Sequence, residues 1–155
     1  MRLILGLVMS GLALGAARAA ERTAPTSAPY SPDLAEIMLS AQWRHLKLSY
    51  AGAQKNWPLA EFEIGQMRKN FAEAATYYPK FDDTAVAKLI KEISEPALDE
   101  VAANVKAKDV EAFKKSFSRL TEACNSCHQA AGKGFIKIRV PWRSPFSNQE
   151  FTPER

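Results

Sequence analysis

The chain has 155 residues, 46% of them hydrophobic and 25% charged, which excludes a disordered or fibrous protein and fits one globular domain. Two cysteines are too few for a disulfide scaffold. The formal charge is +4, but no run of basic and aromatic residues is suited to a phosphate backbone, so we expect no nucleic-acid partner.

Residues 1–19 have the pattern of a secretory signal peptide. A basic residue precedes an uncharged apolar run, and Ala17-Arg18-Ala19 fits the small-x-small rule for cleavage. The alternative is a membrane anchor, which would need about 20 apolar residues, more than this run supplies. We therefore predict cleavage after Ala19, export to the periplasm, a mature charge of +2 and a flexible leader at 20–30.

Two helices are predicted in the first half of the chain. Ser31 is expected to be the N-cap of the first, with Pro32 and Asp33 in its opening turn. The second follows Asn56-Trp57-Pro58 and ends at Pro79. The apolar face of the first helix consists of Leu34, Met38, Ala41, His45 and Leu48, and that of the second of Ala60, Ile64, Met67, Phe71, Ala74 and Tyr78.

Two further helices follow. Asp82-Asp83-Thr84 is expected to cap the third, and Pro96 to kink it or to divide it in two. Asp109 is expected to begin the fourth, which ends near Gly132. The apolar faces consist of Val86, Leu89, Ile90, Ile93, Ala97, Val101 and Val105 in the third helix and of Val110, Phe113, Phe117, Leu120, Cys124 and Cys127 in the fourth.

These four amphipathic segments with short connections predict an all-α fold, an antiparallel four-helix bundle over residues 31–132 with an extended C-terminal tail. The tail, residues 133–155, begins with alternating apolar and basic residues and contains three prolines, so we expect an arm strapped across the bundle. Its expected apolar anchors are Phe135, Ile136, Ile138, Trp142 and Phe146. The alternative is that these side chains form a protein interface.

Residues 124–128 carry the chemistry. Cys124-Asn125-Ser126-Cys127-His128 is a C-x-x-C-H sequence, the attachment motif of c-type haem. Two thiols about one helical turn apart can each add to one of two neighbouring vinyl groups of a porphyrin, and the next residue then directs its imidazole at the iron. The alternatives are a thioredoxin-like redox pair, a zinc site and a plain disulfide. The motif predicts one covalently bound haem c.

At this point the chain resembles the cytochrome c′ type of class II c-type cytochromes, in which a single C-x-x-C-H lies near the end of the last of four helices. The resemblance covers the architecture of residues 31 to about 131, and only the five-residue motif is specific within it. It implies that Cys124 and Cys127 form the thioether bonds and that His128 is the proximal iron ligand. The long tail departs from the cytochrome c′ pattern.

The sixth iron ligand is expected to decide the function, because an axial Met or His favours electron transfer and an open site favours gas binding. The candidates are Met38 and His45, with Met67 less favourable. Depth along the first helix favours Met38, about 4.5 Å from the level of the proximal ligand against about 15 Å for His45. A fourth helix running beyond Gly132 would favour His45, and an open site is the third possibility.

The sequence therefore predicts a periplasmic electron carrier, not an enzyme, with a redox partner protein and a possible homodimer. The alternative is a five-coordinate protein that binds NO or CO. A peroxidase is disfavoured, because His45 alone could supply its acid-base group. Five basic residues are candidates to pair with the haem propionates: Arg44, Lys47, Lys133, Lys137 and Arg139.

Overall fold

The computed structural model describes residues 30–154, and within that range the chain is all-α, with no β-strand. The predicted signal peptide, its cleavage site and nearly all of the leader lie outside the described residues. The helical elements are α1 (Leu34–Ala53), α2 (Trp57–Tyr77), α3 (Val86–Leu89), the π-helical turn η1 (Ile90–Ser94), α4 (Glu95–Lys106) and α5 (Val110–Ala130). None of the helices described is long and apolar enough to cross a membrane.

The first helix begins later than predicted. Its N-cap is Asp33 and not Ser31, because the Asp33 carboxylate accepts a hydrogen bond from the backbone N–H of Ala35 at 2.7 Å. Pro32 therefore precedes the helix, and its carbonyl accepts a hydrogen bond from the Tyr78 hydroxyl at 3.0 Å. The helix dipole also stabilises a negatively charged carboxylate at a helix N-terminus more than an uncharged serine hydroxyl.

The second helix has the expected bounds, whereas the third does not have the expected cap. Asn56 accepts from the N–H of Leu59 at 3.2 Å and caps α2, which ends at Tyr77 ahead of the proline. The cap of α3 is Ala85, without a side-chain hydrogen bond. The predicted Asp82-Asp83-Thr84 cap is wrong because these residues form a tight turn, closed by backbone hydrogen bonds between Phe81 and Thr84.

Pro96 does not divide the third helical segment. The chain passes from α3 through η1 into α4 without a break, and the N–H of Glu95 bonds to the carbonyl of Ile90, five residues earlier. Proline has no N–H to continue the α-helical ladder, and its ring crowds the carbonyl four residues before it. The wider π-turn directly before Pro96 is where the backbone accommodates this interruption.

The fourth predicted helix begins where expected. The Asp109 carboxylate accepts from the N–H groups of Glu111 and Ala112, both at 3.0 Å, and caps α5. The helix ends at Ala130, and Gly132 follows with a positive φ of 68°. Because α5 does not run beyond Gly132, the condition that would favour His45 as the iron ligand is not met.

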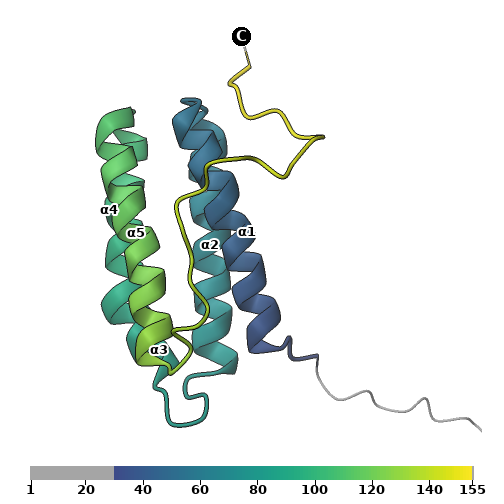
Figure 1. The fold of residues 1–155 in the computed structure, drawn as a ribbon, viewed down its shortest axis with the longest axis vertical. Coiled ribbons are helices and arrows are strands. Elements are labelled where there is room, and N and C mark those ends of the chain that lie inside the picture. The colour runs from purple at the N-terminus through teal and green to yellow at the C-terminus, as the bar shows by residue number, and fades with distance from the viewer. Residues whose placement is uncertain (1–29, 155) are drawn as a thin grey trace, which may run out of the picture. The chain divides into compact units, whose positions relative to one another are not determined.

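The four long helices run side by side, with the N-terminal end of α1 at the same level as the C-terminal end of α5 (Figure 1). The most extensive contacts are between α1 and α2 and between α4 and α5, whereas α1 and α5 meet over a smaller area. Most predicted apolar faces are buried. The fully buried core side chains include Leu48, Met67, Leu98, Val101, Val105, Phe113, Phe117 and Leu120.

Residues 133–154, which we call the arm, run from the end of α5 back along the helices toward the other end of the molecule (Figure 1). The Asn125 side chain binds both backbone groups of Ile138, donating at 2.9 Å and accepting at 2.7 Å. Further along, Phe146 packs against Trp43 with ring centroids 5.3 Å apart. The anchoring is therefore discontinuous, with hydrogen bonds near the motif and aromatic packing farther away.

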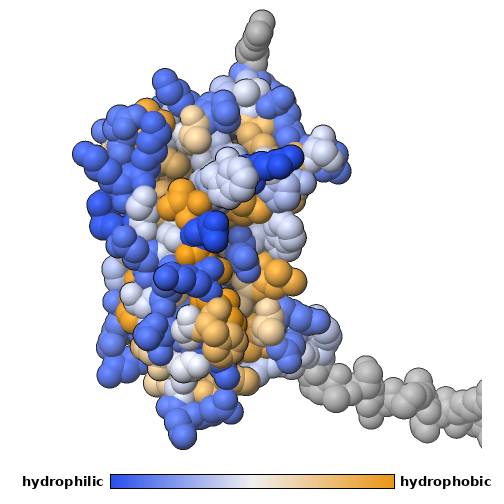
Figure 2. Space-filling view, in the orientation of Figure 1, coloured by the Kyte–Doolittle hydropathy of each residue, from blue (hydrophilic) through white to orange (hydrophobic). Residues whose placement is uncertain are grey.

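The predicted anchors of the arm are correct only in part. Ile138 and Phe146 are half-buried, but Phe135 and Trp142 remain 80% and 79% exposed and are not anchors. Ile136 is also exposed at 45%. The prediction missed Phe151, which is 7% exposed and packs against the ring of Tyr50. On the face that carries the arm, some apolar residues are exposed between hydrophilic ones (Figure 2).

Candidate functional site

The two cysteines of the motif lie in the last turns of α5. Cys124 follows Leu120 by four residues and Phe117 by seven, so it continues the buried stripe of the helix, and it is half-buried. Cys127 is half-buried too, and its thiol is hydrogen-bonded to Ser94 of η1. Both thiols are free. Each thus faces the protein, where a bound group would lie between helices.

Burial keeps both thiols protonated at neutral pH. It raises the pKa of Cys124 to about 12, and the neighbouring Cys127 adds to that shift. Burial also raises the pKa of Cys127, while the hydrogen bond with Ser94 opposes the shift. A redox-active pair needs a thiol pKa lowered by its surroundings. These surroundings act in the opposite direction and disfavour the thioredoxin-like alternative.

The imidazole of His128 is held by the arm. Its Nδ1 lies 2.8 Å from the carbonyl oxygen of Ile136. A carbonyl can only accept, so Nδ1 carries the hydrogen and Nε2 has the lone pair. Nε2 makes no hydrogen bond with any described residue. This is the arrangement in which metal-bound histidines are usually oriented, with the second ring nitrogen donating to a backbone carbonyl or carboxylate.

His45 lies in a different environment. It is 2% exposed, and its ring packs against Phe117 with centroids 4.4 Å apart. Its Nε2 lies 2.9 Å from the Thr121 hydroxyl, which itself donates to the carbonyl of Phe117 at 3.0 Å. The hydroxyl must therefore accept from Nε2–H. Burial lowers the pKa of His45 to about 4, so the ring is neutral at physiological pH.

The contact between His45 and Thr121 sets the register of α1 against α5. The two helices run in opposite directions (Figure 1). Met38 lies seven residues before His45 in α1, and His128 lies seven residues after Thr121 in α5. Each of these steps is about 10.5 Å along the helix axis. Seven residues are nearly two whole turns, so each pair shares a face. Met38 is therefore level with His128, and His45 is not.

The other sequence-predicted candidates are spread over the molecule. Met67 is 1% exposed in the core on α2. Arg44 is hydrogen-bonded to the buried Glu63 carboxylate at 3.3 Å. Lys47 lies over the ring of Phe146, 4.8 Å from its centroid. Lys133 lies over the ring of Phe81, 5.9 Å from its centroid, so three of the five basic candidates already have partners.

The donor set fits a covalently held haem. The two thiols are free, as addition to a vinyl group requires, and the imidazole keeps Nε2 available for iron. Within residues 30–154, no group of three or more His, Cys, Asp or Glu side chains lies close enough to hold a metal ion. A zinc site needs four such ligands, so the described part of the chain does not form one.

Sequence reasoning missed two residues that support this site. Asn125, inside the motif, fixes the arm beside His128, and Ser94 contacts Cys127. Asparagine at that position carries no signal of its own, because the two middle residues of the motif are variable in principle.

Comparison with models of protein families, with curated proteins and with solved structures found no match.

Proposed function

We propose that this protein is an exported c-type cytochrome with one covalently attached haem, and that it transfers electrons in the periplasm. The observation that carries the proposal is the hydrogen bond from His128 Nδ1 to the Ile136 carbonyl within a C-x-x-C-H sequence. Cys124 and Cys127 would form the thioether bonds, and His128 would be the proximal ligand. The haem would supply the one-electron chemistry, and the chain would exclude water and set the potential.

We further propose that the helices form an antiparallel four-helix bundle of the class II type, completed by an extended C-terminal tail. The support is the packing of α1 on α2 and of α4 on α5, together with the position of the motif at the end of α5. In such a bundle the first and last helices are neighbours. A ligand on α1 can then face the haem iron.

Met38 is the sixth ligand that we favour. The register set by His45 and Thr121 brings Met38 level with His128, whereas His45 already has a hydrogen-bond partner in the core. A methionine opposite a histidine raises the reduction potential of a haem and suits electron transfer. The protein would then be an electron carrier and not an enzyme.

A second candidate function is the binding of a small gas such as NO or CO at a five-coordinate iron. The observation that favours it is the engagement of His45 with Thr121, which leaves Met38 as the single candidate at the level of the motif. If the thioether of Met38 stays in the core, against which it packs, the sixth position is open.

The first test is an absorption spectrum of the periplasmic protein, oxidised and reduced, with a pyridine haemochrome assay and CO addition. We expect a c-type haemochrome and sharp low-spin reduced bands that CO does not change. High-spin bands that shift with CO would support the gas-binding alternative instead. A protein exported without haem would contradict both functions.

The partner that we propose is a redox protein that docks on the exposed aromatic side chains of the arm. Phe135 and Trp142 are 80% and 79% exposed and lie on either side of the segment that Asn125 holds. Truncation of the chain after Gly132 should abolish association and leave haem attached. Sedimentation analysis separates this partner from a second copy of the chain, since a homodimer forms in the purified protein.

A further inference from the structure

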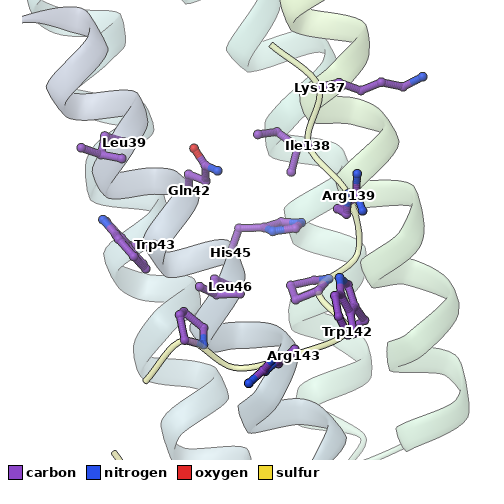
Figure 3. Close-up of a pocket in the computed structure, with 12 residues that line it drawn as sticks. Leu39, Gln42, Trp43, His45, Leu46, Lys137, Ile138, Arg139, Trp142 and Arg143 are labelled. Carbon is purple, nitrogen blue, oxygen red and sulfur yellow. The ribbon is translucent and has the colours of Figure 1, made fainter. Parts of the chain in front are cut away.

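A groove of about 420 Å³ lies between α1 and the arm (Figure 3). His45 reaches from α1 toward the arm at its base, and Ile138 faces it from the arm side. The volume falls in the range of small-molecule sites, which are usually about 300 to 1,000 Å³. None of the proposed attachment residues, Cys124, Cys127 and His128, lines the groove, which is large enough for part of a flat ring.

The charged side chains of this groove are all positive. Arg139, Arg143 and Lys137 line it, and no acidic residue does. The surrounding sequence also lacks negative charge, because residues 123–149 contain no Asp or Glu. Neither arginine forms an ion pair with any described residue. In Figure 3 the side chain of Lys137 extends away from α1, so the two guanidinium groups are the better-placed cations.

Apart from Gln42 and His45, the other lining residues are apolar or aromatic. Trp43 of α1 and Trp142 of the arm line the groove while remaining 44% and 79% exposed. Exposed indole rings on two sides of a groove offer flat surfaces for another flat ring. Guanidinium groups match carboxylates in a planar, two-point geometry that an ammonium group does not provide. The combination suits a flat apolar molecule whose edge carries carboxylates.

The groove is connected to the haem motif by a direct contact. Ile138, which lines the groove, has both backbone groups bound to the side chain of Asn125. Asn125 stands between Cys124 and Cys127 in the sequence. The motif and the groove therefore meet where Asn125 binds Ile138.

We propose that the groove binds the carboxylate edge of a planar apolar ring, with Arg139 and Arg143 as counter-charges and Trp43 and Trp142 as stacking surfaces. One source of such an edge is the propionate side of the protein's own haem, and this source rests on the proposed function. The other source is a free aromatic carboxylate. Both share the same chemistry, and the experiment distinguishes them.

The test uses the full chain with Cys124→Ser and Cys127→Ser, so that no haem is attached, after circular dichroism confirms its helix content. This protein is titrated with iron-free protoporphyrin IX and with its dimethyl ester, and quenching of tryptophan fluorescence is measured. Two of the chain's three tryptophans line the groove. Without iron, His128 contributes no ligand bond, so a preference for the free acid reports on the carboxylates alone.

We expect the free acid to bind about five- to tenfold more tightly than the diester, the effect of one or two exposed charge pairs. The preference should disappear in Arg139→Gln/Arg143→Gln. It should persist in a control with the same charge change, Lys69→Gln/Lys106→Gln, whose residues are exposed on α2 and α4. Equal binding of acid and diester, or an unchanged preference in the arginine variant, would overturn the proposal.

The same titration of the haem-loaded wild-type protein identifies the source. If the haem's own propionates occupy the groove, added porphyrin does not bind. If added porphyrin still binds, the natural ligand of the groove is a free aromatic carboxylate. The two proposals also fail separately. If the chain never acquires haem but prefers the free acid, the proposed function fails and the groove proposal stands. If the protein carries haem but shows no such preference, only the groove proposal fails.

Discussion

The ring of His128 and the backbone carbonyl of Ile136 are joined by a hydrogen bond of 2.8 Å, which ties the end of α5 to the first residues of the arm. The bond fixes both the tautomer and the rotation of the imidazole. It is supported three residues earlier by Asn125, which binds both backbone groups of Ile138. A segment without regular secondary structure thus orients the residue on which the proposed function depends.

Replacing Asn125 by Ala should release the arm next to His128. The variant loses two hydrogen bonds in a half-buried setting, so we expect the free energy of unfolding in urea to fall by about 1 to 2 kcal/mol. The reduction potential of the haem protein should also shift, because the imidazole loses its fixed orientation. Asn148→Ala is the control, since Asn148 is exposed on the same arm. Equal potentials in wild type and N125A would show that the arm does not position His128.

Two substitutions on α1 distinguish the candidate iron ligands. In the haem protein, Met38→Ala should convert a low-spin spectrum to a high-spin one that responds to CO. His45→Ala should keep the low-spin spectrum but lower stability by about 2 to 3 kcal/mol, because it leaves a cavity and removes the hydrogen-bond partner of Thr121. Absorption spectra and urea unfolding of both variants measure this. The opposite assignment of spectra would make His45 the ligand.

The apolar periodicity was sufficient to locate the helices and most of the core. Phe113, Phe117 and Leu120 are spaced to share one face of a helix, and that spacing requires no knowledge of the partners. The partner of His45 could not be found in this way, since Thr121 lies 76 residues away and follows from how two helices pack. The C-x-x-C-H motif was recognisable because its chemistry lies within five consecutive residues.

The arm was harder to predict for a related reason. A segment without helical or strand periodicity has no repeated face, so the hydrophobicity of Trp142 and Phe151 alone did not indicate which of them is buried. The buried one is Phe151, because it meets the ring of Tyr50 at the far end of α1. Likewise, Ser31 and Asp33 are both good caps, and the sequence alone does not show that the Asp33 carboxylate is the one that accepts from the Ala35 N–H.

The close packing of α1 and α5 is testable at Gly52. A Cβ atom added there would overlap the ring of Phe113, which is 2% exposed and has little room to move. Gly52→Ala should therefore lower the free energy of unfolding by about 1 to 3 kcal/mol, the usual cost of overpacking. The matched control is Gly65→Ala on α2, where an added Cβ has no neighbour within 4 Å. That variant should gain about 0.5 to 1 kcal/mol from helix propensity. Equal effects of both substitutions on the urea midpoint would contradict the close approach.

The buried carboxylate of Glu63 should make stability depend on pH. Burial raises its pKa above the ordinary 4.5, and Arg44 and Lys47 only partly oppose this effect. The folded state therefore keeps a proton that the unfolded state releases. As pH rises above 4.5, the free energy of unfolding falls until the pH passes the pKa of Glu63 in the folded state. The total loss is about 1.4 kcal/mol for each pH unit between the unfolded and folded pKa values.

Glu63→Gln cannot ionise and should escape this loss. Relative to wild type, its free energy of unfolding should rise between pH 4.5 and neutral pH and become constant above the folded pKa, as measured by urea unfolding at a series of pH values. Glu61→Gln, on the exposed side of α2, is the control and should run parallel to wild type. If the Glu63 variant also ran parallel, or lost stability relative to wild type as pH rose, the desolvation of this carboxylate would be outweighed by its pairing with Arg44.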